Sequence, residues 1–106
     1  MMNMQKLLQM GQQMQSQMAD IQEDLETKEV SASSGGGMVT AVVDGKGGVK
    51  KVTIDPTVVD PADVEMLEDL VLAAISEAQN QARGVYEEEM KKVAGGLPFP
   101  MKLPGF

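Results

Sequence analysis

The chain contains no cysteine, no histidine and no tryptophan. Without cysteine it can form no disulfide and carry out no thiol redox chemistry, which fits a reducing cytosol. The usual zinc ligands are missing too, as is the commonest general base, and no Ser-His-Asp triad can form. The sequence therefore favours a protein that acts by binding, and it predicts neither an enzyme nor a cofactor.

Aromatic residues are scarce, and Tyr86, Phe99 and Phe106 are the only ones. The 10 methionines, with valine, leucine, isoleucine and alanine, must fill the core. Flexible methionine suits the irregular gaps between helices and sheets. No stretch approaches the roughly 18 consecutive apolar residues of a membrane span. Glutamines interrupt the methionines and leucines at the start of the chain, so we expect no signal peptide there.

Positive charge is in the minority, with 9 lysines and arginines against 16 aspartates and glutamates and a net charge of −7. Such a balance argues against a simple polyanion binder, so nucleic-acid binding requires the cations to be segregated. The sequence shows some segregation, because lysines gather around residues 46–51 and after Glu89. The alternative is that these lysines are part of an ordinary solvated surface and bind nothing.

Residues 3–28 predict one long helix, because apolar side chains recur at heptad-like spacing. From Asp20 onward the surface of this helix becomes acidic. The apolar stripe must lie against something, and both the core of the same chain and a partner helix remain open. Its members are Met4, Leu7, Met14, Met18, Ile21 and Leu25.

The middle of the chain predicts a three-stranded antiparallel meander, with strands at 29–34, 38–44 and 49–54. Val39, Ala41 and Val43 share one face of the central strand. Asp44-Gly45 is a standard hairpin signal, because glycine accepts positive φ. The segment 45–48 superficially resembles a phosphate loop. It lacks the Gly-Lys-Ser/Thr ending and leads into a strand, so a turn is the better interpretation.

A second long helix is predicted up to about Ala94, with Gly95-Gly96 ending it. Asp60 is the expected N-cap and Pro61 the expected first helical residue. Ala74, Ala78 and Ala82 recur on one face, and their small size lets a neighbour approach closely. Carboxylates cluster at 65–69 and 87–89. A carboxylate-only metal hydrolase is conceivable, but such clusters are usually solvated surface, and we predict no metal site.

These elements give an α+β fold of order α-β-β-β-α, with residues 1–94 as one domain and 95–106 as a Gly/Pro-rich tail. Both helices span roughly 26–34 residues, or about 39–51 Å at 1.5 Å per residue. A three-stranded sheet cannot cover that length. We therefore expect helix surface that overhangs the sheet or meets a second subunit, and a homodimer.

The sequence resembles the YbaB/EbfC family of bacterial nucleoid-associated proteins over nearly its whole length. The order and spacing of several short segments carry the resemblance. They are the Met- and Gln-rich first helix, Gly35-Gly36-Gly37-Met38-Val39, Asp44-Gly45, Val52-Thr53-Ile54-Asp55-Pro56, Glu65-Met66-Leu67-Glu68-Asp69-Leu70-Val71, Ala73-Ala74, Gly95-Gly96-Leu97-Pro98 and Pro104-Gly105-Phe106.

The resemblance implies a tweezer-like homodimer that binds double-stranded DNA with little sequence specificity, organises the nucleoid and affects gene expression in the bacterial cytoplasm. It implies no catalytic residue, no membrane partner and no small-molecule substrate. The alternative is a protein-interaction adaptor that uses the Met-rich helix and the acidic surface without binding DNA. The candidate DNA contacts are Lys6, Lys50, Lys51, Arg83, Lys91 and Lys92.

Overall fold

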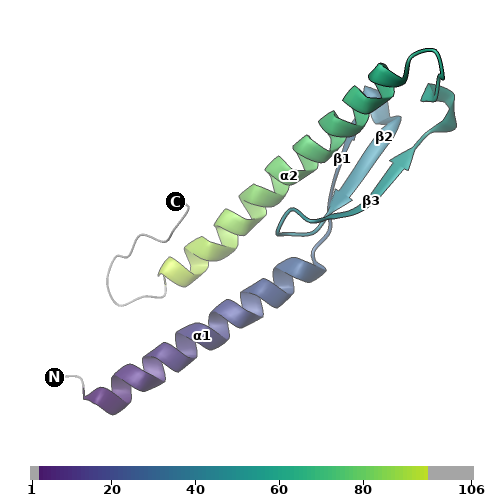
Figure 1. Ribbon diagram of the computed structural model, residues 1–106. Helices are drawn as coiled ribbons and strands as arrows, with labels where there is room; N and C mark the ends of the chain where they lie inside the picture. Colours follow the sequence, from purple (N-terminus) through teal and green to yellow (C-terminus); the bar gives the residue numbers. More distant parts are fainter. Residues whose placement is uncertain (1–2, 96–106) are drawn as a thin grey trace.

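The computed structural model describes residues 3–95 as two long helices joined by a small antiparallel sheet (Figure 1). The order of the elements confirms the predicted α-β-β-β-α fold. The Gly/Pro-rich segment from residue 96 onward lies outside the described residues, so the tail and its domain boundary stay predictions. The elements are α1 (Met4–Thr27), β1 (Val30–Ser34), β2 (Val39–Val43), β3 (Val49–Ile54) and α2 (Val64–Gly95), with 3₁₀ turns at Gly35–Gly37 and Pro56–Val58.

The sheet is a meander in the order β1-β2-β3, with both pairs antiparallel. Ala41 on the central strand lies opposite Ala32 on β1 and Val52 on β3. Burial alternates along β2, which confirms that Val39 and Val43 share the core face with Ala41. One face of the sheet is therefore apolar across all three strands.

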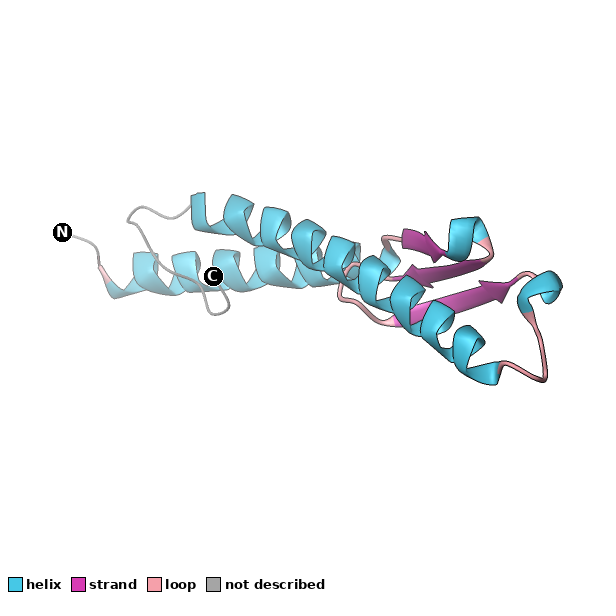
Figure 2. Ribbon diagram, turned by 90° about the horizontal axis from the view of Figure 1, so that it is seen from above, coloured by secondary structure: helices cyan, strands magenta, loops and turns pink. Residues whose placement is uncertain are grey.

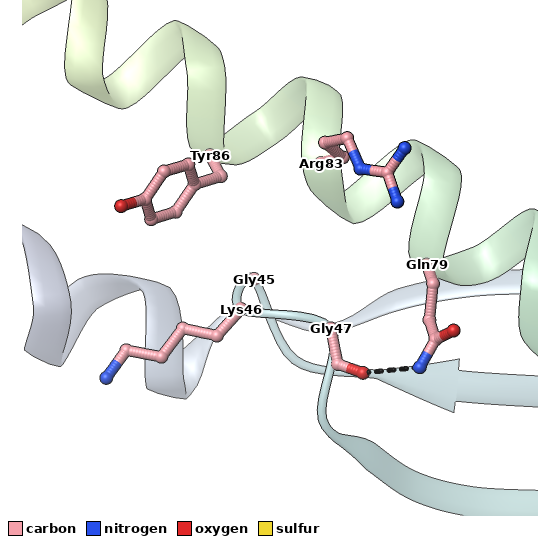
Figure 3. A pocket seen from close by; sticks show the side chains of 6 residues that line it. All are labelled: Gly45, Lys46, Gly47, Gln79, Arg83 and Tyr86. Atoms are coloured by element: carbon pink, nitrogen blue, oxygen red, sulfur yellow. Dashed lines mark hydrogen bonds between the residues drawn. The ribbon is translucent and has the colours of Figure 1, made fainter. Parts of the chain in front are cut away.

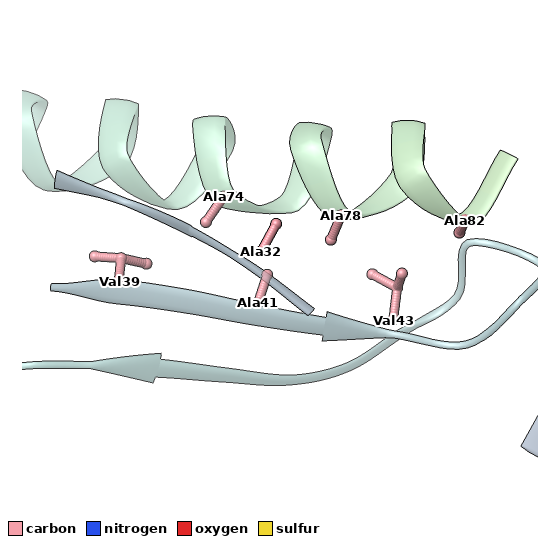
Figure 4. Packing of buried hydrophobic residues seen from close by; sticks show 7 residues of the cluster. All are labelled: Ala32, Val39, Ala41, Val43, Ala74, Ala78 and Ala82. Carbon is pink, nitrogen blue, oxygen red and sulfur yellow. The ribbon is translucent and has the colours of Figure 1, made fainter. Parts of the chain in front are cut away.

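Helix α2 covers β1 and β2 on that apolar face (Figure 4). Ala74, Ala78 and Ala82 point at the sheet and are buried, as are Val39 and Val43 beneath them. Because alanine carries only a β-carbon, the backbone of α2 can come close to the strands. The neighbour predicted to approach the alanine stripe is therefore the sheet of the same chain.

The predicted start of the second helix was wrong by three residues. Asp60 caps a turn instead: its Oδ1 accepts from the Ala62 N–H at 2.9 Å, and its carbonyl accepts from the Asp63 N–H at 2.9 Å. Asp63 then accepts from the Met66 N–H at 3.2 Å, and α2 begins at Val64. Both aspartates have N-cap chemistry, and the second caps the helix because the first closes an Asx turn.

Helix α1 begins where the Asn3 side chain accepts a hydrogen bond from the Lys6 N–H at 2.8 Å. Its apolar stripe is buried only near the sheet: Leu25 is fully buried, whereas Met4 is 73% exposed and Leu7 is 50% exposed. Met14, Met18 and Ile21 lie between them and are half-buried, so the cover within the chain decreases from the sheet toward the start of α1.

The molecule is elongated, measuring 71 × 21 × 16 Å with a radius of gyration of 19.6 Å. A compact domain of about 100 residues has a radius of gyration near 13 Å. Helix α1 and the second half of α2 extend the same way beyond the sheet, as predicted from helix length (Figures 1 and 2). Within residues 3–95, neither helix is long and apolar enough to cross a membrane.

Candidate nucleic-acid interface

The structure distributes the six candidate DNA contacts over four regions. Lys6 lies in the first turns of α1, far from the sheet, and Lys50 and Lys51 lie on β3. Arg83 lies on α2 where it passes the β2–β3 turn, and Lys91 and Lys92 lie in its last turns. The described part of the chain therefore presents these candidates as several small cationic regions and not as a single basic face.

Lys92, at the end of α2, belongs to an ion-pair cluster that joins the two helices. Lys28, which follows α1, donates to Glu89 Oε1 at 3.1 Å, and Lys92 donates to the same oxygen at 3.2 Å. The Glu89 side chain is only 12% exposed. Lys28 was not among the predicted site residues. Because 61 positions separate it from Glu89, no local pattern in the sequence reveals the contact.

These contacts set the protonation of Glu89. The hydrogen bond from Lys28, followed by that from Lys92, holds the pKa of Glu89 below its ordinary value of 4.5, and desolvation opposes them only in part. Since a lowered pKa means that folding favours the charged carboxylate, the cluster stabilises the fold at neutral pH. That stabilisation is lost as the pH falls below about 4.5 and through the lower folded value.

We therefore expect Glu89→Gln to melt at a lower temperature than the parent chain at pH 7, with the gap narrowing as the pH falls below about 4.5 toward pH 3. Thermal unfolding followed by circular dichroism across this range measures the effect. Glu88→Gln is the matched control, because Glu88 is exposed and makes no ion pair among the described residues. A gap that is equally wide at pH 3 would contradict this role for Glu89.

The β2–β3 turn is held by the Asp44 carboxylate. Its Oδ1 accepts from the backbone N–H of Lys46 at 2.8 Å and of Gly48 at 3.0 Å. The bond from Gly48 is the main cause that lowers the pKa of Asp44 below its ordinary 3.8. The carboxylate that organises this turn is therefore charged at neutral pH.

Gly45 has a different role from the one predicted. The turn residue with positive φ is Gly47, at +91°, and not Gly45. The Gly45 N–H donates to the Leu25 carbonyl at 2.7 Å, and a β-carbon at position 45 would lie 2.8 Å from that oxygen. Glycine is needed at position 45 because the end of α1 rests directly on the turn.

A hollow of about 410 Å³ lies between this turn and α2 (Figure 3). Gln79 closes one side, because its Nε2 donates to the Gly47 carbonyl at 3.0 Å. The other lining residues are Gly45, Lys46, Arg83 and Tyr86. The structure thus brings the candidate Arg83 together with Lys46, a lysine that the sequence analysis left out of the site.

Lys50 and Lys51 lie on the strand that α2 leaves uncovered. Lys51 pairs with Val42 on the face of the sheet away from α2, and the register shifts between Val42 and Val43, so Lys50 lies at the bulge. All six residues of β3 are exposed. Both lysines are therefore accessible from solution in one protomer.

No group of three or more Asp or Glu side chains is placed to bind a metal ion within the described part of the chain. The carboxylates at 65–69 begin α2, where the positive end of the helix dipole favours negative charge. Glu89 pairs with two lysines. These acidic groups therefore have structural explanations.

Comparison with known proteins gives a consistent result. A sequence model described as the YbaB/EbfC DNA-binding family matches residues 1–97. A nucleoid-associated protein of Gemmatimonas aurantiaca is 46% identical over 99 residues, which cover 93% of this chain and 95% of that protein. Another, from Clostridium kluyveri, is 50% identical over 98 residues, which cover 92% of this chain and 86% of that protein.

The fold also has a counterpart among solved structures. The crystal structure of an uncharacterized protein from Helicobacter pylori superposes with a TM-score of 0.71, covering 90% of this chain and 96% of that one. The two sequences are 22% identical, so this likeness concerns the fold alone.

Proposed function

The chain belongs to the YbaB/EbfC DNA-binding family, and from this membership we propose that it is a nucleoid-associated protein that binds double-stranded DNA. The observation that carries the proposal is the family match over residues 1–97. Such a protein acts by binding rather than by catalysis, in the cytoplasm where the nucleoid lies. The family match does not favour the adaptor alternative.

Binding through the phosphate backbone suits the chemistry of this chain. Each phosphate that a lysine or arginine neutralises releases condensed counterions, and this gain is independent of base sequence. Tyr86 is the only aromatic residue within 3–95. The described part of the chain therefore has no series of aromatic side chains on which exposed bases could stack. Low sequence specificity and a strong dependence on salt follow from this mode of binding.

We propose that the DNA-binding unit is a homodimer, because one protomer leaves apolar surface uncovered beside α2. Val49, Val52 and Ile54 lie opposite the buried Val43, Ala41 and Val39, hence on the core face of the sheet. Helix α2 does not extend over them, and they are 49%, 36% and 36% exposed. We call these three residues the open face of β3.

Two further features favour a second copy as the cover. Strand β3 is an edge strand, so its outer backbone groups are free to pair. Val64 and Leu72 on α2 are also exposed apolar side chains, at 51% and 64%. An apolar surface of this kind is typical of association sites, and a two-fold axis would bury it once on each copy.

Dimerisation would also compensate for the small number of cations on one chain. Two copies double every cationic region on one body, and simultaneous contacts raise the overall affinity above that of one region alone. The helices that extend beyond each sheet would then form a pair of arms. The dimer is thus the unit in which weak phosphate contacts add up.

DNA binding is tested by titrating a labelled duplex with the full chain at several salt concentrations. We expect the double variant Lys91→Gln, Lys92→Gln to bind more weakly. The slope of log affinity against log salt should fall by about 1 for each lysine that neutralises a phosphate. Fluorescence anisotropy measures both quantities.

The matched control is Asn80→Asp, Gln81→Glu, which makes the same change in net charge at exposed positions on the same helix. It should weaken binding less and leave the salt slope nearly unchanged. The absence of any duplex binding by the parent chain at low salt would overturn the proposed function.

A further inference from the structure

The hollow beside the β2–β3 turn has a lining whose charge is opposite to that of the whole protein. Two of its six lining residues, Lys46 and Arg83, are cations, and none is a carboxylate. The chain as a whole carries 16 acidic and 9 basic residues. The lining of this hollow is therefore cationic, although Glu26 of α1 pairs with Lys46 beside it.

Its wall is built from one face of α2. Gln79, Arg83 and Tyr86 follow one another at spacings of four and three, so their side chains lie on neighbouring turns of the helix. The floor is the Gly45–Gly47 turn, which carries only one side chain, that of Lys46 (Figure 3). The hydrogen bond from Gln79 to the Gly47 carbonyl fixes the turn against the helix.

The two cations differ in whether they form an ion pair. Lys46 is held at 2.8 Å by Glu26 of α1, so its charge is partly satisfied. Arg83 forms no ion pair within residues 3–95, and its side chain is exposed. The guanidinium group is thus available for a ligand, and its planar donors match two oxygens of a phosphate.

On the basis of the proposed DNA-binding function, we propose that this hollow is a site for a phosphate ester whose phosphate is bound by Arg83. The Lys46 ammonium and the Tyr86 hydroxyl point away from Arg83, so they would contact the rest of the ester (Figure 3). A volume of about 410 Å³ exceeds a bare phosphate and leaves room for an attached sugar. The same chemistry is offered by the DNA backbone and by free polyphosphates. In the first case one backbone phosphate lies where α1, α2 and the sheet meet.

Tyr86 makes the site directly observable. It is the only tyrosine, and the chain has no tryptophan, so tyrosine emission reports on this hollow alone. We expect the emission to change in a saturable way when the full chain is titrated with a short unlabelled duplex. Titration with inorganic pyrophosphate tests the second source. A response to the duplex alone would assign the site to DNA.

Arg83→Gln should weaken the response at least about tenfold, and Arg83→Lys, which keeps the charge but loses the planar donors, should weaken it less. Lys91→Gln removes one charge from the same helix outside the hollow and should leave the pyrophosphate response unchanged. Circular dichroism checks that each variant is folded. Because Arg83 is exposed, we expect no loss of structure.

The labelled-duplex assay separates failure of this site from failure of the proposed function. If the duplex binds but neither the duplex nor pyrophosphate changes Tyr86 emission, or if Arg83→Gln responds like the parent chain, the hollow is no phosphate site while DNA binding stands. If no duplex binds but pyrophosphate changes the emission through Arg83, the site stands and the proposed function fails. If neither ligand changes the emission, the site is refuted.

Discussion

Replacing Val52 and Ile54 by aspartate is expected to convert the dimer into a folded monomer of 11.3 kDa. Both side chains lie on the open face of β3, which a second copy is proposed to cover. An unpaired carboxylate moved from water into an apolar contact costs several kcal/mol, and two-fold symmetry repeats each substitution. The dissociation constant should therefore rise about 100-fold or more.

The mass in solution, measured by sedimentation over a range of concentrations, gives the result. Thr53→Asp is the matched control, because Thr53 pairs with Thr40 on the other face of the same strand. It should leave the dimer intact. A parent chain that is monomeric at micromolar concentration would refute the dimer. Dissociation by Thr53→Asp to the same extent would place the interface elsewhere.

The second large effect is expected at Ala78, where α2 lies directly on the sheet. Its side chain is fully buried in the cluster that contains Val39, Ala41 and Val43. A leucine there would push α2 off the strands, and overpacking of this kind typically costs about 1–3 kcal/mol. For a domain of this size, each kcal/mol lowers the melting temperature by roughly 4–8 °C.

Ala78→Leu should therefore melt about 5–20 °C below the parent chain when compared by calorimetry at equal protein concentration. Ala73→Leu introduces the same side chain on the same helix at an exposed position, and it should change the melting temperature little. Equal losses from both variants would mean that helix propensity, and not contact with the sheet, sets the cost.

Short-range patterns were sufficient to predict the fold. Alternation along Val39–Val43 gave the central strand and its buried face, because side chains in a strand point to opposite sides in turn. The alanines of α2 recur at helical spacing and mark the face that contacts the sheet. Where two residues could perform the same local task, as Asp60 and Asp63 could, only the full hydrogen-bond pattern decides between them.

The candidate site was harder to predict, because its contacts join distant positions. Lys28 meets Glu89, and Gly45 meets Leu25, through the packing of helices against the sheet. Composition identified the lysines as candidates, but it could not reveal that Lys92 shares an oxygen with Lys28 or that Arg83 lines a hollow with Lys46. The six candidates remain predictions as DNA contacts.

The short joint between α1 and the sheet has a mechanical consequence. Helix α1 has 24 residues and is held at one end, by Leu25 on the Gly45 turn and by Lys28 on Glu89. Because the helix is about 36 Å long, a 10° tilt at this joint would move its tip by roughly 6 Å. In the proposed DNA-binding dimer, the contacts near this joint would therefore determine how far apart the two α1 helices lie.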